Sequence, residues 1–412
     1  MSGFTGILRC PRCYLERDET DVFLVCAHCA REGYNVNPLP LYDWTGVDPD
    51  PLPERRGLFA WQHLLPLADT AAPVTLGEGD TPLVELTRVR SADAVGQLWV
   101  KDESRNPTWS YKDRLIAVSL TKAREKGVDT VAVASTGNHG AAAAAYAARA
   151  GIRCIVLTVA SVPAPMKTLM QAYGAIVVAL AHPRDRWALL RQGVTERGWT
   201  PLSGFMDPPA GSNPYGIDGY KSIAYEIVRD LGRAPTVLVA PVAYGDGLTG
   251  ILRGFEDLVS WGRIEEVPRL LAAEPIGPYR AALADGFDPG RRLCEPETTV
   301  AFSIASPVAT FQGYDALLRS GGCATVVDDA DLLTTQLELA ASEGLYLEAS
   351  SVATLATLPK LVRHGEVDAT DSVVLLGTST GLKDIDTTAR LLPPVPEIAA
   401  TMAELDAVVD GR

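Results

Sequence analysis

The sequence is short of basic residues: 37 lysines and arginines stand against 51 aspartates and glutamates, which gives a formal net charge of −14 over 412 residues. A protein that binds nucleic acid needs a basic surface for the phosphates. Helices that lie on an anionic membrane are also rich in lysine and arginine. The composition therefore argues against both nucleic acid and a membrane as partners.

Long hydrophobic runs are missing as well. The blandest stretch, residues 140–150, is mostly alanine and contains Arg149, whereas a membrane-spanning helix needs about 18 uncharged apolar residues. The first residues show no basic segment followed by an apolar one, as a secretory signal would. The 7 cysteines are too few for a disulfide scaffold of this length. We therefore expect a cytoplasmic protein.

The chain is 47% hydrophobic and 21% charged, a composition typical of a folded protein with a packed core. It is longer than the roughly 250–300 residues at which a single hydrophobic core stops growing. Short β-like runs alternate with helical ones. Strands are expected at 98–101, 130–134, 154–159, 176–180, 236–240, 300–304 and 373–376. Helices are expected at 112–126, 140–150, 166–173, 186–197, 218–230, 248–260, 330–342 and 351–364. This alternation predicts an α/β fold with parallel sheets covered by helices on both faces.

The first 45 residues differ from the rest, because Cys10, Cys13, Cys26 and Cys29 form two C-x2-C pairs. Two such pairs can hold one Zn²⁺ through four thiolates, and a site closed by four ligands is structural rather than catalytic. The alternative is a ribbon that keeps its fold with reduced, metal-free thiols. The proline- and aspartate-rich residues 37–54 are expected to form an extended linker.

A lysine stands at the start of a predicted helix, in the run from Asn106 to Arg114. The helix dipole and burial would both lower the pKa of Lys112 and favour a neutral amine, which could form a Schiff base. Taken alone, Lys112 would more often be a solvated surface residue. Asp113 and Arg114 are expected to form a structural ion pair.

Three further segments follow predicted strands and have the composition of ligand sites. Residues 135–140 and 377–384 offer rows of hydroxyl groups, and residues 241–250 contain three glycines ahead of a helix. Small residues and free N–H groups at such turns suit a carboxylate or a phosphate, although glycine-rich turns also serve plain packing. The carboxyl ends of parallel strands are where α/β sheets bind ligands.

Together these motifs resemble the threonine synthase family of fold type II pyridoxal-phosphate enzymes, in the tryptophan synthase β superfamily. The likeness runs from the cysteine pairs through Gly77–Leu83, the NPTxSxKDR run, the STGN turn and Asn213–Lys221 to Glu348–Ser351 and the TxxGLKD run. The resemblance implies two parallel-sheet α/β domains: a large one from residues 46–105 and 225–395, and a smaller one from residues 106–224. Residues 1–45 would form a zinc-ribbon-like extension and residues 396–412 a tail. It also implies a homodimer.

The resemblance assigns roles to matched positions. Lys112 would attach pyridoxal 5′-phosphate covalently and then move protons at the substrate. The other positions with implied contacts to cofactor or substrate are Asn138 at the phenolic oxygen, Gly245, Asp246, Gly247, Leu248 and Thr249 at the phosphate, Thr378 at the pyridine nitrogen, and Ser135, Thr136 and Gly137 at the substrate carboxylate. The Asp246 side chain is expected to point away and cap its helix. Glu348 matches a loop that lines the cofactor site.

The chain departs from the family pattern at positions that bear on the substrate. Trp109 replaces a glycine, and either packs in the core or narrows the pocket. His139 replaces a threonine, as in serine/threonine dehydratases, and either completes the helix start or binds substrate and moves protons. Gly216 stands where the family has an arginine that contacts the substrate phosphate. The variant Gly216→Arg is therefore expected to favour a phosphorylated substrate.

The leading hypothesis is a pyridoxal-phosphate-dependent lyase that carries out β- or γ-elimination or replacement on a small amino acid, nearest to threonine synthase but with a divergent substrate. A serine/threonine dehydratase-like ammonia lyase is the alternative enzyme. A ligand-binding paralogue without catalysis is the alternative outside enzymes, against which Lys112, Asn138 and Thr378 argue.

Overall fold

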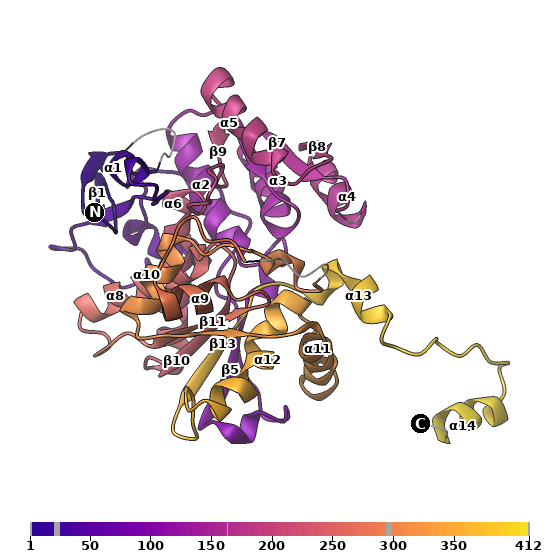
Figure 1. Ribbon diagram of the computed structural model, residues 1–412. Coiled ribbons are helices and arrows are strands. Elements are labelled where there is room, and N and C mark those ends of the chain that lie inside the picture. Colours follow the sequence, from indigo (N-terminus) through magenta and orange to yellow (C-terminus); the bar gives the residue numbers. More distant parts are fainter. Residues whose placement is uncertain (1, 20–24, 163, 294–298, 411–412) are drawn as a thin grey trace.

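The structure is a computed structural model that describes residues 2–19, 25–162, 164–293 and 299–410 (Figure 1). At the N-terminus, strands β1 (Phe4–Arg9), β2 (Glu16–Asp18) and β3 (Leu39–Tyr42) form an antiparallel sheet in the order β2-β1-β3. Strand β3 lies inside the stretch that we expected to be a linker, so that expectation is wrong for residues 39–42. Its register with β1 pairs Pro40 with Leu8, which is fully buried; burial of β3 against β1 outweighs the low strand propensity of proline.

The largest sheet has six strands in the order β12-β11-β10-β13-β5-β4. Its strands are β4 (Leu83–Glu85), β5 (Gln97–Asp102), β10 (Val237–Pro241), β11 (Arg269–Glu274), β12 (Ala324–Val326) and β13 (Ser372–Gly377). All neighbours are parallel except β4, which runs antiparallel to β5. Strands β10 and β13 are buried along their whole length, as expected for a parallel sheet with helices on both faces.

A second parallel sheet has the order β8-β7-β6-β9. It consists of β6 (Thr130–Ala134), β7 (Arg153–Val159), β8 (Ile176–Leu180) and β9 (Thr200–Pro201). One continuous apolar core runs between the two sheets, from Val131 and Val133 through helix residues such as Leu115 to Leu238 and Val374. The two parallel sheets confirm the α/β fold class.

Fourteen helices and six 3₁₀ segments are present in the described part of the chain. The helices are α1 (Ala27–Arg31), α2 (Lys112–Glu125), α3 (Asn138–Ala150), α4 (Ala164–Ala172), α5 (Asp185–Arg197), α6 (Pro214–Ile217), α7 (Lys221–Leu231), α8 (Asp246–Ser260), α9 (Pro278–Asp285), α10 (Phe311–Arg319), α11 (Asp329–Glu343), α12 (Ala349–Arg363), α13 (Ile385–Ala389) and α14 (Met402–Asp410). The 3₁₀ segments are η1 (Gly57–Leu64), η2 (Ala92–Ala94), η3 (Glu103–Arg105), η4 (Asp218–Tyr220), η5 (Phe302–Ile304) and η6 (Gly381–Lys383).

The expected strand at residues 300–304 is wrong. The segment forms η5 instead, after a turn in which the N–H of Val300 donates to Asp329 and the N–H of Ala301 donates to the Thr299 hydroxyl. These side-chain acceptors replace the partners that a neighbouring strand would provide. Conversely, β11 was not expected, because its Leu-Leu-Ala-Ala core favours helix by propensity; pairing with β10 and β12 overrides that preference.

The C-terminal residues leave the body of the molecule. After α13 the chain runs out as an extended segment that ends in α14, well away from both sheets (Figure 1). No residue of α14 is buried. Among the described residues, no helix has the length and apolar character that crossing a membrane would demand.

Candidate active site

The backbone ahead of Lys112 is joined to the end of β13. The N–H of Tyr111 donates to the carbonyl group of Thr378 at 2.9 Å. Ser110 forms an isolated antiparallel bridge with Ser379, and both residues are fully buried. These contacts place Lys112, the first residue of α2, beside the carboxyl end of a central parallel strand, where α/β sheets bind ligands.

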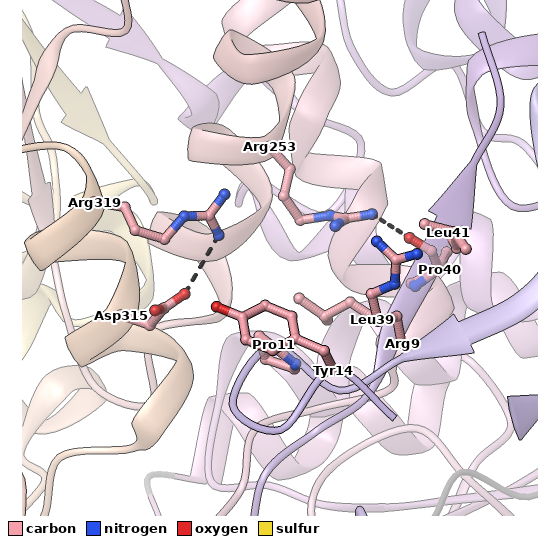
Figure 2. A pocket seen from close by; sticks show the side chains of 9 residues that line it. All are labelled: Arg9, Pro11, Tyr14, Leu39, Pro40, Leu41, Arg253, Asp315 and Arg319. Atoms are coloured by element: carbon pink, nitrogen blue, oxygen red, sulfur yellow. Dashed lines mark hydrogen bonds and ion pairs between the residues drawn. The ribbon is translucent and has the colours of Figure 1, made fainter. Parts of the chain in front are cut away.

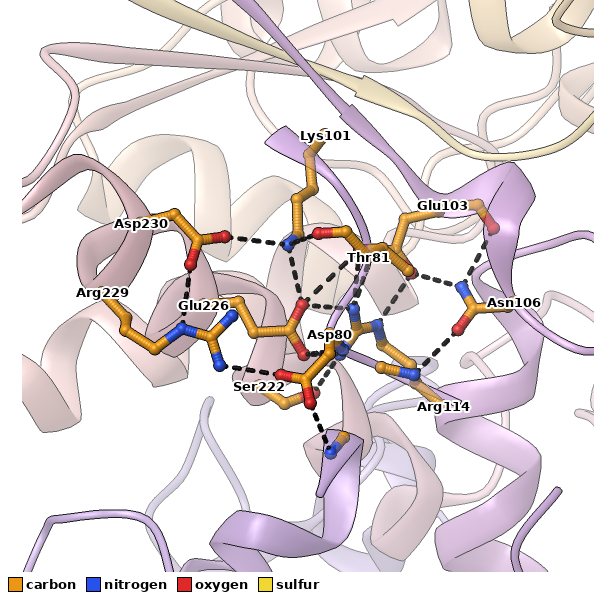
Figure 3. Close-up of polar contacts among 12 residues, drawn as sticks. Asp80, Thr81, Lys101, Glu103, Asn106, Arg114, Ser222, Glu226, Arg229 and Asp230 are labelled. Carbon is orange, nitrogen blue, oxygen red and sulfur yellow. Dashed lines mark hydrogen bonds and ion pairs between the residues drawn. The ribbon is translucent and has the colours of Figure 1, made fainter. Parts of the chain in front are cut away.

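Behind Lys112, a buried group of charged side chains fixes helix α2 (Figure 3). Arg114 is fully buried and pairs with Glu103 at 2.7 Å and with Glu226 at 2.6 Å. Glu226 also pairs with Lys101 at 2.7 Å. Because loss of one partner from a buried ion pair costs about 3–5 kcal/mol, this group holds the first turn of α2 rigidly against β5, η3 and α7.

Asp113 takes no part in this group, so the expected ion pair between Asp113 and Arg114 is wrong. Successive side chains on a helix point in different directions. The carboxylate of Asp113 accepts the N–H of Thr108 at 2.6 Å, and burial raises the pKa of Asp113 to about 7. The buried side chain of Asp113 therefore holds the segment before α2, through Thr108, against the first turn of the helix.

The amine of Lys112 is available for chemistry. The residue is half-buried, and its Nζ lies 4.7 Å from the ring centre of Tyr111 and 5.9 Å from that of Tyr220. The two rings stack with their centres 4.7 Å apart. Among the described residues, no hydrogen bond or ion pair engages this Nζ. The two aromatic rings flank the amine and leave its nitrogen free of hydrogen bonds from the described chain.

The turn between β6 and α3 contains the predicted carboxylate site. The hydroxyl oxygen of Ser135 accepts the N–H groups of Gly140 at 2.9 Å and Gly137 at 3.2 Å, so it closes its own helix start. The first helical hydrogen bond is donated by Ala141. The N–H groups of Asn138 and His139 precede it and point out of the helix start, where an anion can accept them.

Asn138 belongs to a polar cluster that also contains Glu348 and Lys383. The amide nitrogen of Asn138 donates to Glu348 at 3.1 Å, and its amide oxygen accepts from the Nζ of Lys383 at 2.7 Å. Burial raises the pKa of Glu348 and lowers the pKa of Lys383 to about 8, while the attraction of Glu348 and Asp113 opposes the shift of the lysine. The same nitrogen lies 3.3 Å from the other oxygen of Glu348. One hydrogen can serve both oxygens of a single carboxylate, and an amide nitrogen carries two, so the second hydrogen of Asn138 can be donated to a ligand.

His139 lies close to Lys112. Burial lowers the pKa of His139 to about 3, the positive charge of Lys112 acts in the same direction, and the backbone of Leu202 opposes the shift. The Nε2 atom is inaccessible to solvent and has no hydrogen-bond partner in the described chain. At neutral pH the imidazole is therefore uncharged, so it does not supply the near-neutral proton exchange that we considered from the sequence.

The glycine-rich turn leads from β10 into α8 and packs beside the lysine. A Cβ on Gly247 would lie 3.1 Å from the ring of Tyr111, and a Cβ on Gly245, whose φ is +72°, would lie 2.4 Å from the Cα of Gly313. The first helical hydrogen bond runs from the N–H of Thr249 to Gly245 at 2.9 Å. The N–H groups of Asp246, Gly247 and Leu248 have no acceptor within the helix and can bind an anion, whereas the N–H of Thr249 is already bonded to Gly245. The side chain of Leu248 packs in the core.

The carboxylate of Asp246 points away from that turn. It accepts from the hydroxyl of Ser212 at 2.6 Å, from the backbone N–H of Ser212 at 3.0 Å and from the amide of Gln312 at 2.6 Å. It makes no cap bond to its own helix, so the expected capping role is wrong. The side chain holds the turn through neighbouring loops and stays clear of the predicted phosphate.

Thr378 is the first residue after β13. Its buried hydroxyl lies 2.8 Å from the hydroxyl of Ser351, which also accepts the N–H of Ser379 at 2.9 Å. A neutral hydroxyl pair, rather than a carboxylate, therefore stands at this position.

Trp109 is not a core residue. It is 43% exposed, and its φ of +60° lies in the left-handed region that favours glycine. The structure thus removes the core-packing explanation for this tryptophan and leaves its ring at the surface, three residues before Lys112.

Sequence reasoning missed two residues that hold this arrangement together. Lys383 stood inside the TxxGLKD run, so its motif was a usable signal. Gln312 lies on α10, outside every motif, and donates to the carbonyl group of Tyr244 at 2.8 Å as well as to Asp246. Nothing in the local sequence marks it, because its role depends on α10 packing against the glycine-rich turn.

The four N-terminal cysteines come together as predicted. Their sulfur atoms lie within 4.8 Å of one another, with Cys10 and Cys29 at 3.7 Å and Cys13 and Cys26 at 3.5 Å. Four thiolates arranged tetrahedrally at the usual Zn–S distance of about 2.3 Å have sulfurs about 3.8 Å apart. The cluster therefore fits a structural zinc ion.

The other residues fit pyridoxal 5′-phosphate. An unengaged primary amine, a helix start with three open N–H groups, the spare donor of Asn138 and the hydroxyl of Thr378 surround the same strand ends. Thr136 and Gly137 lie at the same edge, and a Cβ on Gly137 would meet only the Phe302 ring, at 3.8 Å, so their turn is open to a small ligand.

Comparisons with known proteins agree with this chemistry. Residues 74–379 match the family described as pyridoxal-phosphate dependent enzyme. The threonine synthase of Methanocaldococcus jannaschii is 34% identical over 348 residues, which is 82% of this chain and 83% of that protein. The threonine synthase of Methanosarcina acetivorans is 33% identical over 408 residues, 97% of each chain. An L-serine ammonia-lyase from Rhizomucor miehei superimposes with a TM-score of 0.63 at 19% identity, over 75% of this chain and 97% of that one, which is a likeness of fold alone.

Proposed function

Because the chain belongs to the pyridoxal-phosphate-dependent enzymes, in the threonine synthase family, we propose that it catalyses elimination or replacement at the β or γ carbon of a small amino acid. The family and the fold class that the motifs implied are thereby confirmed. The substrate, the residue roles and the bound zinc belong to the proposal.

One observation carries the proposal: the half-buried amine of Lys112 stands free of hydrogen bonds where the glycine-rich turn, the STGN turn and the end of β13 meet. A primary amine in a partly apolar setting is the group that attaches an aldehyde cofactor. We assign Lys112 as that residue.

The residues that would hold the cofactor follow from the same geometry. The N–H groups of Asp246, Gly247 and Leu248 would bind its phosphate, the second hydrogen of Asn138 its phenolic oxygen, and the hydroxyl of Thr378 its ring nitrogen. When bound, the cofactor would supply an electron sink for the carbanion at the substrate Cα. A hydroxyl partner makes that sink gentler than an aspartate would, which suits elimination better than transamination.

The chain's own groups would handle the substrate. Its carboxylate would lie on the N–H groups of Asn138 and His139, in the turn formed by Ser135, Thr136 and Gly137. The Nζ of Lys112 would take the proton from Cα. The uncharged imidazole of His139 would bind the substrate rather than carry a proton.

The substrate is proposed to differ from the phosphorylated one of threonine synthases. A Cβ on Gly216 would lie 2.1 Å from the Ser119 hydroxyl and 2.6 Å from the Leu115 carbonyl, because α6 packs tightly on α2. An arginine there would require the helices to move, so our expectation that Gly216→Arg would add a phosphate contact does not fit this packing. The ring of Trp109, three residues before Lys112 and 43% exposed, is proposed to restrict the space available to the substrate.

A dehydratase-like ammonia lyase is the second candidate, favoured by His139. The test incubates the holoenzyme with O-phosphohomoserine, serine and threonine, and follows threonine, free phosphate and oxo acid. Threonine with stoichiometric phosphate would select the threonine synthase reaction. Oxo acid and ammonia from serine or threonine would select the lyase. No turnover of these or of the O-acetyl and sulfonate derivatives of small amino acids would refute the proposed chemistry.

A further inference from the structure

The C-terminal arm, residues 391–410, exposes apolar side chains that its own chain does not cover. Its seven exposed apolar residues range from 39% accessible at Ile398 to 92% at Val395. On α14, Met402, Leu405 and Val409 follow a helical spacing that places them on one face. In the described chain, the hydrogen bonds of residues 398–410 join them only to one another. An exposed apolar face of this kind marks a candidate interaction surface.

The arm is also acidic and stiff. It contains Glu397, Glu404, Asp406 and Asp410 and no basic residue. Pro393, Pro394 and Pro396 favour an extended segment over one that folds back. The arm leaves the body beside α13, on the side opposite to α10 and the N-terminal sheet (Figure 1). A surface that binds the arm should therefore combine apolar and basic groups. It should also lie away from α13, where the arm leaves the body.

A pocket on the opposite side combines arginines and apolar groups with one carboxylate, that of Asp315 (Figure 2). We call it the arginine pocket; it has a volume of about 300 Å³ and is lined by Arg9, Arg253 and Arg319 together with apolar groups such as Leu39, Leu41 and Pro11. It lies between the N-terminal sheet and helices α8 and α10. One of the lining side chains, Tyr14, is itself 72% accessible.

The three arginines keep donors for a further carboxylate. Arg9 pairs with Glu16, Arg253 with Asp218, and Arg319 with Asp315 and Glu256. Each guanidinium has five N–H donors. Within the described chain, one terminal nitrogen of Arg9 and one of Arg253 make no hydrogen bond, and neither does the Nε of Arg319.

We propose that α14 of one copy docks in the arginine pocket of a second copy of this chain. The stripe of Met402, Leu405 and Val409 lies on the apolar wall, and the carboxylates of Glu404, Asp406 and Asp410 face the arginines. In a two-fold dimer the exchange is reciprocal, since each copy carries one arm and one pocket. The eleven residues 391–401 span up to about 35–40 Å when extended, enough to reach a neighbouring molecule.

The test measures self-association of the full-length holoenzyme by sedimentation velocity over a range of concentrations. Arm variant Leu405→Asp and pocket variant Arg319→Glu are each expected to weaken association at least tenfold, and the milder Arg319→Ala to weaken it less. Arg363→Glu, an exposed arginine at the end of α12, is the matched control and should leave association unchanged. Unchanged circular dichroism and cofactor absorbance identify variants that have folded.

Mixing distinguishes exchange between copies from other contacts. A one-to-one mixture of Leu405→Asp and Arg319→Glu chains retains one intact arm and pocket, so it should associate more strongly than either variant alone. A monomeric wild type, or variants that associate like the wild type, would overturn the proposal. A mixture that associates no more strongly than either variant alone would also overturn it. So would evidence that the arm binds the pocket of its own chain, that is, binding that does not depend on protein concentration.

Discussion

The hydroxyl group of Ser379 donates to the backbone carbonyl of Trp109 at 3.1 Å, and the N–H of Thr380 donates to the same oxygen at 3.3 Å. These two bonds clamp Trp109 in its left-handed conformation and join the residues before Lys112 to the end of β13. The left-handed backbone of Trp109 costs about 1–3 kcal/mol, and the two hydrogen bonds hold it there and so fix the position of Lys112.

Replacing Trp109 by glycine should stabilise the fold and widen the site. Glycine adopts this φ without steric cost, although it raises the entropy of the unfolded chain, so the expected net gain is about 0.5–1 kcal/mol. Urea denaturation should show a higher midpoint for Trp109→Gly, and KM should fall for bulkier amino acids. Trp109→Ala, which removes the ring but keeps the strain, is the control; equal midpoints for the two variants would contradict the role of the backbone.

Replacing His139 by threonine should reduce the sensitivity of the fold to acid. Folding lowers the pKa of this histidine from 6.5 to about 3, so between these values the unfolded chain binds a proton that the folded chain does not. Stability is therefore lost as the pH falls through that window, by about 2.7 kcal/mol at pH 4.5. The difference in urea midpoint between pH 7.5 and pH 4.5 should be smaller in His139→Thr than in the wild type. The same change at exposed His364 should leave that difference unaltered; a wild-type difference in His139→Thr would show that this ring titrates normally.

Replacing Gln312 by alanine should weaken cofactor binding. The variant loses the donor to Asp246 and to the carbonyl group of Tyr244, so the glycine-rich turn is no longer held against α10. Titration of the apoprotein with pyridoxal 5′-phosphate should give a dissociation constant about ten times higher, which corresponds to about 1.4 kcal/mol. Gln62→Ala, at a glutamine of similar burial that donates to Ala71, is the matched control. Equal affinities for both variants would mean that the turn holds its shape alone.

The cysteine cluster should contain about one zinc ion per chain. Cys10→Ser removes one of four thiolates and should lose the metal and destabilise the N-terminal sheet. Because the cluster is built from residues 10–29, the absorbance of the bound cofactor should persist in this variant. Metal analysis of purified protein checks the first statement and an absorbance scan the second; a metal-free wild type would contradict the zinc assignment.

The sequence was a good guide where an element is local. The strand expected at residues 176–180 agrees with β8 at both ends, and the helix at 112–126 agrees with α2 to within one residue. Motif residues such as Lys112 and Asn138 could be proposed as site residues because their types and spacing are themselves the signal.

It was a poor guide where long-range packing decides. The clash that excludes a side chain at Gly216 comes from Leu115 and Ser119, about one hundred residues away in sequence. The engagement of Asp246 by Gln312 likewise arises only when α10 meets α8. The periodicity of helices and strands reports only local structure, so contacts between residues far apart in the chain could not be predicted from one sequence.

The most direct test of the central assignment is to reduce the holoenzyme with borohydride, which fixes an imine-linked cofactor to its lysine as a stable amine, and to locate the modified residue by peptide mass spectrometry. We expect the pyridoxyl group on Lys112, and no modification of any lysine in Lys112→Ala. A pyridoxyl group on Lys383, or on any lysine other than Lys112, would contradict it.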